Sequence, residues 1–561
     1  MKQKYFITEK RSMRMMVKWL GVAFFTLHSS FFILSCADYN ETDNFTAQPD
    51  PAFVEPYKDL APIKSYIDRN IYPNMTLGAQ LKVADFNKQE LAHAAAVTNF
   101  DNVAFGSTLM SGSIVNAKGV MNFLDMKDLL DHVEEIGGEV FGSPIVANAD
   151  QADGWLSTLT APIEIVVDYV EGKTVNFNDM EVGNFASKAT IAKYDNQNVL
   201  KIPASDSVCI IDNFPVDPKA KYTTTFWAKA DKEINYNINF SGTPVAGTGT
   251  NGTWALKQGK WTKIVVEAQS DPEVTNGYLA IKTGRGVTIY IQKVQVGYYP
   301  DNHRPQTAQE QSDTINYALN AWCDGLMKIN AGRIKSFDLI DEAINAKATL
   351  DNGMLDLKHS TDKIFWPDIL GSENYAPAVS RVASAAFEKH GGNPAELRFF
   401  ISEAGLEDAK KLESLKYWIN IWDNNGAKID GINAKLNLTY SEDADKQAAN
   451  VATLNTLLDN LASTGKLIRL SNFDIRYQDA TGANVVAKDI TADQRQQLAD
   501  YYAYVIKTYM AKIPNDKQAG ICKGNMSDTG DPVGLWSIDT SSKDWVRTAT
   551  YKAFCDALSG K

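Results

Sequence analysis

The feature that most constrains the fold is a change of pattern within the chain. Short apolar strands alternate with helical stretches from about residue 56 to 155, and again from about 305 to the end. Between about 162 and 300 the helical periodicity disappears, and short β-branched runs follow one another across turns such as Asn251-Gly252. Alternating strands and helices indicate a parallel sheet, whereas many short strands at regular spacing indicate an antiparallel sandwich. One domain is therefore predicted to be split by another.

The two alternating segments contain eight strand candidates. Three precede the β-rich segment and five follow it, at residues 76–81, 103–106, 139–146, 336–342, 397–404, 431–438, 468–475 and 534–540. Eight strand–helix units make a (β/α)8 barrel. The sequence predicts an α/β fold, a TIM barrel interrupted after its third strand by an antiparallel β-sandwich. The predicted barrel parts are residues 56–160 and 303–561, and the insert is 161–302.

Composition excludes several classes of function. Hydrophobic residues make up 44% of the chain and aromatic residues 10%, which is ample for large buried cores. The formal net charge of −12 leaves little basic surface to neutralise phosphates, so no nucleic-acid partner is expected. The sequence has no P-loop, no dinucleotide-binding glycine run and no His/Cys cluster at metal-ligand spacing. We therefore expect no cofactor and no metal.

The N-terminus has the pattern of an export signal. A basic region precedes the apolar stretch 19–34, which is too short to be a stable membrane span. The sequence Ile33-Leu34-Ser35-Cys36 resembles a bacterial lipobox, in which the cysteine becomes the lipidated first residue. A plain signal peptide or a signal anchor is the alternative. We interpret residues 1–36 as a lipoprotein signal peptide.

The residues after the lipobox extend this interpretation. Residues 37–55 are polar, acidic and then proline-containing, and we interpret them as a tether. An acidic stretch just after the cysteine resembles the surface-export signal of Bacteroidota lipoproteins. The protein is thus expected to be secreted and anchored by lipid to the outer membrane, facing the cell exterior.

The barrel prediction locates a candidate site. Barrel enzymes keep their chemistry at the C-terminal ends of the strands, which gathers Glu342, Glu403, Asn437, Asn472 and Trp536 around one mouth. The fourth strand, SFDLIDE, ends in a pair of carboxylates. Because side chains alternate along a strand, the first of the pair is expected to point to the other face from Glu342.

Several segments resemble motifs of glycoside hydrolase family 10, the endo-1,4-beta-xylanases. IKSFDLIDEAINA resembles the family's fourth-strand WDVVNEA, which implies that Glu342 is the acid/base residue. The stretch 365–405, AKIDGINAKLNL and VGLWSIDTSSKDW resemble later motifs in the same order. The resemblance spans residues 56–155 and 305–561, and the insert resembles a carbohydrate-binding module. This arrangement is associated with family members from gut Bacteroidota.

The departures from the family pattern bear on activity. The family's nucleophile is the glutamate of TELDI, whereas the matching segment 471–475 reads SNFDI and has Asn472 at that position. The polar motifs of strands two and three are replaced in segments 106–111 and 142–148, and strand six has Lys435 and Asn437 in place of glutamine and histidine. A retaining glycosidase needs two carboxyl groups, and an amide is a poor nucleophile.

Other residues are weaker candidates. An inverting mechanism could pair Glu342 with Asp474 or Glu403, although a structural hydrogen-bonding role explains both. Sugars stack on aromatic rings, so tryptophans near the mouth and aromatic residues of the insert are candidate binding residues, with core packing as the alternative for the tryptophans. These candidates are Trp155, Trp366 and Trp536 in the barrel and Tyr236 and Trp254 in the insert.

Three hypotheses follow. The first is a cell-surface glycan-binding lipoprotein on a degenerate xylanase scaffold, which binds xylan or a related hemicellulose beside other components of a glycan-uptake system. The second is an active endo-1,4-beta-xylanase-type hydrolase with Glu342 as acid/base and a displaced second carboxylate. The third is a structural or protein-binding lipoprotein with no affinity for glycans. Asn472 favours the first hypothesis over the second.

Overall fold

The computed structural model describes residues 57–561 except 234–238, 242–255, 271–272 and 540–542. The predictions for the signal peptide, Cys36, the tether, Tyr236 and Trp254 therefore lie outside the described residues. Within the part that is described, none of the helices combines the length and apolar character needed to cross a membrane.

A parallel sheet of nine short strands closes into a barrel. Its third barrel strand is made of two pieces, since β3 pairs with β2 on one side while Gly142 bridges Phe337 and β4 pairs with β17 on the other. The nine pieces thus fill eight barrel positions, which confirms the predicted (β/α)8 barrel. The strands are β1 (Thr76–Gln80), β2 (Asn102–Ala104), β3 (Glu139–Val140), β4 (Val146–Ala147), β17 (Ser336–Asp341), β20 (Arg398–Ala404), β21 (Gly431–Ser441), β22 (Leu467–Gln478) and β23 (Gln518–Lys523).

The predicted eighth strand was wrong. The eighth barrel strand is β23, whereas Trp536–Ile538 forms β24, which pairs antiparallel with β25 (Trp545–Arg547) after the barrel has closed. All six residues of β23 are buried, so this strand lacks the polar alternation that marks a half-exposed strand. The segment QAGICK is also short and ends in a charged residue, so its sequence resembles that of a loop.

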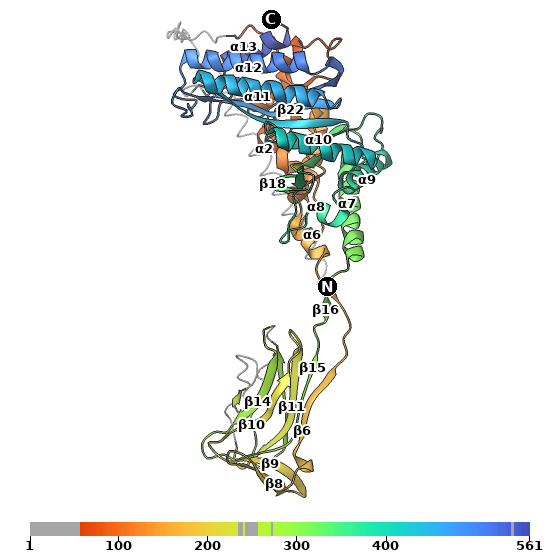
Figure 1. Ribbon diagram of the computed structural model, residues 1–561, viewed down its shortest axis with the longest axis vertical. Helices are drawn as coiled ribbons and strands as arrows, with labels where there is room; N and C mark the ends of the chain where they lie inside the picture. Colours follow the sequence, from red (N-terminus) through yellow and green to blue (C-terminus); the bar gives the residue numbers. More distant parts are fainter. Residues whose placement is uncertain (1–56, 234–238, 242–255, 271–272, 540–542) are drawn as a thin grey trace, which may run out of the picture. The chain divides into compact units, whose positions relative to one another are not determined.

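Helices surround the barrel. Figure 1 shows α11, α12 and α13 stacked above β22 in the view and α10 below it, and α11 and α12 contact β21 and β22 respectively. Several of the long helices begin at side-chain caps, including Thr307 before α7, Asp408 before α10 and Thr491 before α12. The helices are α2 (Val83–Asn87), α3 (Leu91–Asn99), α4 (Ser111–Ile114), α5 (Leu124–Glu135), α6 (Asp153–Leu159), α7 (Ala308–Asn330), α8 (Trp366–Leu370), α9 (Tyr375–Lys389), α10 (Ala409–Asn424), α11 (Ala444–Ala462), α12 (Ala492–Lys512) and α13 (Ala549–Leu558).

Shorter elements complete the barrel loops. After β17 the chain forms a hairpin of β18 (Ile344–Thr349) and β19 (Leu355–Leu357). Single 3-10 turns of the barrel are η1 (Ile63–Tyr66), η2 (Gly106–Leu109) and η4 (Asn515–Lys517), of which η2 follows β2 at the C-terminal end of the barrel, while η3 (Phe177–Asp179) belongs to the insert.

Polar side chains from three strands meet inside the barrel. The Asn433 amide donates to both carboxyl oxygens of Asp338 at 3.0 Å each, and the buried Arg469 guanidinium lies 3.8 Å from the centroid of the Phe141 ring. Burial raises the pKa of Asp338 to about 7, although the charge of Arg469 opposes the shift. This network links β17, β21 and β22.

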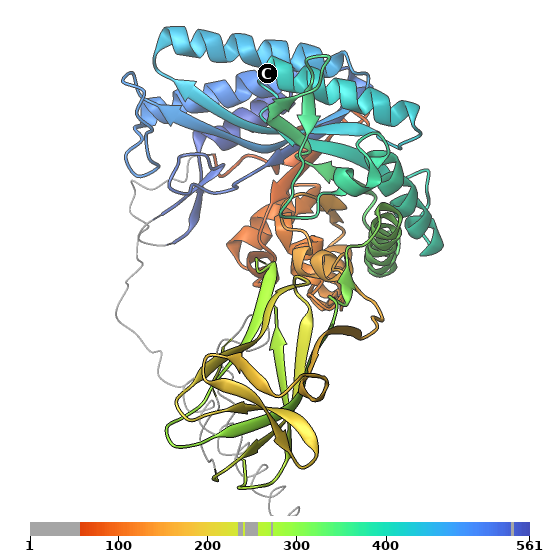
Figure 2. The same ribbon diagram turned by 60° about the horizontal axis from the view of Figure 1, so that its bottom comes forward.

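The segment between α6 and α7 forms antiparallel sheets, as the alternating runs indicate. Figure 2 shows these strands in yellow and yellow-green. A seven-stranded sheet and a three-stranded sheet bury a common apolar core. The strands are β6 (Val170–Asn176), β7 (Gly183–Ala186), β8 (Ala189–Tyr194), β9 (Gln197–Ile202), β10 (Ser207–Pro215), β11 (Lys221–Ala230), β12 (Asn239–Ser241), β13 (Thr262–Gln269), β14 (Asn276–Lys282) and β15 (Ile289–Tyr299). Whether this segment binds carbohydrate stays a prediction.

The chain enters and leaves the insert at one place. Strands β5 (Ile163–Glu164) and β16 (His303–Arg304) pair antiparallel, with Glu164 opposite His303. The Gln306 amide donates to the carbonyl oxygens of Leu159 and Ala161 at 2.7 and 3.1 Å. The ends of the two barrel parts are therefore joined by hydrogen bonds.

Candidate active site

A cavity of about 950 Å³ opens at the C-terminal ends of the barrel strands. We call it the mouth cavity. Residues at the ends of β1, β2, β17, β20, β21 and β22 line it, together with residues 524–533 and Trp545. Three of the residues predicted from the sequence to meet at the mouth do so, namely Glu342, Asn437 and Asn472.

Glu342 and its neighbour share one cation. Strand β17 ends at Asp341, and Glu342 has a left-handed backbone with φ 48°. This turn breaks the side-chain alternation of the strand, so the expectation that the two carboxylates point apart was wrong. The Lys435 ammonium lies 2.6 Å from the Asp341 carboxylate and 3.1 Å from that of Glu342. Lys435 therefore bridges the pair.

The environment of Glu342 favours its ionised form. Partial burial would raise the pKa of this carboxyl, but the Lys435 ammonium outweighs burial, and Lys358 at 3.8 Å adds to its effect. The pKa of Glu342 is thus lower than its ordinary value. A general acid must hold a proton at the working pH, and catalytic glutamates of this kind have raised pKa values. The ion pair thus favours Glu342 as a carboxylate whose oxygens can accept hydrogen bonds.

Asn472 occupies a bulge in β22. Lys435 pairs with Ser471, but the next pair is Asn437 with Asp474, so two residues of β22 face one residue of β21. Asn472 has φ 49°, a left-handed conformation that asparagine adopts more readily than most residues. The bulge places its exposed side chain on the mouth cavity, where it offers an amide and no charge.

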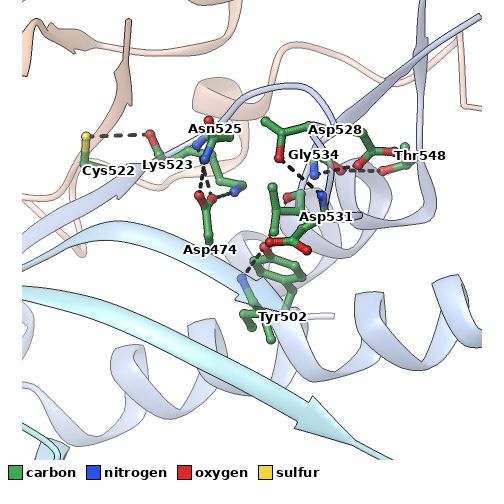
Figure 3. Close-up of polar contacts among 12 residues, drawn as sticks. Asp474, Tyr502, Cys522, Lys523, Asn525, Asp528, Asp531, Gly534 and Thr548 are labelled. Atoms are coloured by element: carbon green, nitrogen blue, oxygen red, sulfur yellow. Dashed lines mark hydrogen bonds and ion pairs between the residues drawn. The ribbon is translucent and has the colours of Figure 1, made fainter. Parts of the chain in front are cut away.

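Asp474 lines the same cavity but is bound by its neighbours. Figure 3 shows its carboxylate held by Lys523, with which it forms an ion pair, and by Asn525. The Asn525 side chain donates to Asp474 at 2.6 Å, and the Asn525 backbone N–H donates at 3.2 Å. Lys523 is fully buried on β23, which lowers its pKa, while the Asp474 charge opposes that shift. Asp474 is thus needed to neutralise a buried ammonium.

Glu403 lies beneath the cavity wall. Its side chain is fully buried on β20 and is absent from the cavity lining. The Lys411 ammonium is 2.8 Å from this carboxylate, and the backbone N–H of Ile344 donates to it at 3.2 Å. These contacts tie β20 to α10 and to the β18 hairpin. They support the structural role for Glu403 and remove it as a sugar contact or a second catalytic base.

The three tryptophans predicted near the mouth are buried. Trp155, Trp366 and Trp536 are 6%, 4% and 5% exposed, and none of them lines the mouth cavity. The Trp366 indole N–H donates to Gln151 at 2.9 Å, and core packing is therefore the better explanation for these rings. The cavity tryptophan is Trp545 on β25, whose ring centroid lies 5.7 Å from that of Trp536. The sequence-based prediction put Trp536 at the mouth, whereas Trp545 is the tryptophan of this hairpin that lines the cavity.

Sequence reasoning also missed two charged residues. Lys435 was noted only as a replacement, although a lysine opposite a carboxylate pair is a recognisable signal for an ion pair. Glu407 follows β20 in the loop GLED and lines the cavity half-buried. Loop carboxylates are common, so the sequence offers no sign that this one faces the cavity.

Comparisons with known proteins identify a family and a relative that the chain resembles. Residues 298–530 match the model of glycosyl hydrolase family 10, which includes strands β17 to β23. Endo-1,4-beta-xylanase A of Cellvibrio japonicus is 20% identical over 279 residues, which are 47% of this chain. The matched region spans 43% of the length of that relative.

Solved structures resemble the chain in fold. Native xylanase10C from Cellvibrio japonicus has a TM-score of 0.50 at 12% identity, over 88% of this chain and 72% of that one. Xylanase B from Clostridium stercorarium has a TM-score of 0.49 at 12% identity, over 89% and 100%. The resemblance to glycosyl hydrolase family 10 drawn from the motifs is thus confirmed over residues 298–530, a segment that supplies strands β17 to β23 of the (β/α)8 barrel.

Proposed function

We propose that this protein is a glycan-binding member of the xylanase fold that binds xylan or a related hemicellulose without hydrolysing it efficiently. One observation carries the proposal. The carboxylate at the acid/base position, Glu342, is ion-paired with Lys435, and the position of the partner carboxylate holds Asn472 on the same cavity. Retaining and inverting mechanisms both require a protonated carboxyl and a second carboxylate.

The alternative, a hydrolase with a displaced second carboxylate, has two candidate residues for that carboxylate. The contacts of both residues argue against this alternative. Asp474 is ion-paired with Lys523, and Glu403 is buried against Lys411 outside the cavity. Recruiting either as a base would leave the buried Lys523 or the half-buried Lys411 without its counter-charge, which is destabilising.

The cavity retains what glycan binding needs. Its volume suits several sugar rings, and its lining combines one tryptophan with amides and charged groups that can make directed hydrogen bonds. The relatives described as xylanases favour a xylan-like polysaccharide as the ligand. The lipobox-like N-terminus supports a location on the outer membrane, facing the exterior, beside other components of a glycan-uptake system.

Two assays test the proposal. Reducing-end release from xylan and arabinoxylan should be at background level for the wild type and unchanged in Glu342→Gln. Affinity electrophoresis on a panel of hemicelluloses should retard the wild-type protein on a xylan-type gel. Turnover that is abolished by Glu342→Gln would replace the proposal with the hydrolase, and a mobility unaffected by every polysaccharide would favour the structural lipoprotein.

A further inference from the structure

The acidic side chains of the mouth cavity are not equivalent. Among the described residues, five acidic side chains line it, and four of them are ion-paired. The fifth, Glu407, has no ion pair with any described residue. The four pairs are Asp85 with Lys88 at 3.3 Å, Glu342 with Lys435 at 3.1 Å, Asp531 with Arg476 at 3.0 Å, and Asp474 with Lys523.

Glu407 is held by backbone rather than by charge. It lies in the loop between β20 and α10, and its carboxyl accepts hydrogen bonds from its own backbone N–H and from that of Asn437 on β21. Lys411, at the start of α10, is directed elsewhere, because its ammonium contacts Glu403 at 2.8 Å and the carbonyl oxygen of Ala404 at 2.6 Å. The loop therefore presents a half-buried carboxyl with spare acceptor capacity.

We propose that Glu407 is the carboxylate that binds the glycan in the mouth cavity, by accepting hydrogen bonds from two hydroxyl groups of a neutral sugar. This inference rests on the proposed function and names the residue that carries it. Neighbouring hydroxyls on a sugar ring match the two oxygens of an ionised carboxylate, both of which accept hydrogen bonds. The four ion-paired carboxylates would each have to share these oxygens with a lysine or arginine.

The surroundings of Glu407 strengthen this assignment. Burial raises the pKa of its carboxyl, because water solvates the charge poorly there, while the backbone N–H groups and the more distant Lys411 only partly compensate. A half-buried carboxylate without a cation gains more from a hydroxyl donor than an exposed one does. Asn437 lies next to it on the cavity lining, so a sugar bound there can also meet the amide of Asn437.

The test measures the affinity of the full-length protein for xylohexaose by isothermal titration calorimetry. We expect Glu407→Ala to weaken binding by roughly 10- to 100-fold, since hydrogen bonds to a charged group are lost. Glu407→Gln keeps one acceptor oxygen and should weaken binding less. Glu413→Gln, an exposed residue of α10 paired with Lys416, is the matched control and should bind as the wild type does. Circular dichroism melting verifies that each variant is folded.

A pH series separates a direct contact from a merely structural role. The groups that face Glu407 are the backbone N–H of Asn437 on β21 and Lys411 on α10, with Glu403 on β20 paired to that lysine. Wild-type affinity should fall on acidification as Glu407 takes up a proton, at a pH above that of an ordinary glutamate. In Glu407→Gln this decline should be absent.

The outcomes are distinguishable. A wild-type protein that binds no glycan contradicts the proposed function and this inference together. Wild-type binding that Glu407→Ala leaves unchanged, or a pH decline that persists in Glu407→Gln, overturns the assignment of Glu407 alone. Reducing-end release that depends on Glu407 would make this residue an acid catalyst instead, and would overturn its role as a binding carboxylate.

Discussion

At the scale of single residues, Lys435 decides what the mouth cavity can do. Its ammonium joins two carboxylates that a regular strand would keep on opposite faces, and the left-handed backbone of Glu342 makes this possible. A left-handed glutamate is strained by roughly 1 kcal/mol or more, so the ion pairs offset a local cost. The same contact that stabilises the loop lowers the pKa of Glu342 and so disfavours the protonated form that an acid catalyst needs.

Replacing Lys435 tests this link. Lys435→Gln should lower the free energy of unfolding by about 2 kcal/mol at pH 7, because two partly buried carboxylates lose their shared cation. The pKa of Glu342 in the folded protein is lowered, so its stabilising contribution is complete above the ordinary value of 4.5 and is lost as the pH falls through the folded value. Urea unfolding at pH 7 and pH 3 should therefore show a smaller difference between variant and wild type at acid pH. The exposed Lys347→Gln is the control, and equal losses at both pH values would contradict the argument.

Restoring a carboxylate at position 472 should not restore hydrolysis. Asn472→Glu supplies the missing negative charge, but Glu342 remains ionised by Lys435 and cannot protonate a leaving group. Reducing-end release from xylan should stay at the background of Glu342→Gln. If Asn472→Glu released more reducing ends than Asn472→Gln, a proton donor would be present. The ion pair of Glu342 with Lys435 would then not prevent catalysis.

At the scale of elements, the hairpin of β24 and β25 divides two tryptophans between core and cavity. Trp536 is buried and packs at 5.3 Å from the Tyr551 ring, whereas the half-buried Trp545 lines the mouth cavity. The two rings are in contact, so the hairpin ties the cavity wall to α13.

The two positions should respond differently to substitution. Trp536→Ala should cost about 3–5 kcal/mol of stability, as expected for a large buried side chain. Trp545→Ala should cost less stability but weaken xylohexaose binding about tenfold, because it removes an aromatic face on which a sugar can stack. Urea unfolding and calorimetric titration of both variants check this. A Trp545→Ala protein that binds as tightly as the wild type would show that no sugar stacks on this ring.

The sequence-based predictions were accurate for strands that lie between clear helices and less accurate for a buried strand and for loops. Seven of the eight barrel strands were located because their apolar runs lie between helices with clear periodicity. The eighth was missed because β23 is buried on both faces, and a tryptophan-rich hairpin nearby looked more like a strand. Within the site, strand positions such as Asn472 follow from the motif order. Features set by loops and by backbone conformation, such as the position of Glu407 on the cavity and the left-handed turn at Glu342, leave no pattern in the sequence.

At the scale of the whole molecule, the two segments that connect the barrel to the insert lie side by side. The third barrel strand pairs with β17 from the far side of the insert, so the barrel closes only when segments separated by the insert meet. The pairing of β5 with β16 and the bonds of Gln306 hold the two crossings together. The two crossings are thus held together by contacts that lie outside the sheets of the insert.

Deleting the insert therefore tests which part binds the glycan. In a variant with residues 165–302 replaced by Asn-Gly, the partners Glu164 and His303 are joined by a two-residue turn that suits an antiparallel hairpin. We expect this protein to fold with a cooperative melting transition and to keep its retardation on a xylan gel, because every residue of the mouth cavity remains. Circular dichroism melting and affinity electrophoresis measure both properties. A folded variant that has lost retardation would move the glycan site to the insert, and a variant that does not fold would mean that barrel closure depends on the insert's own packing.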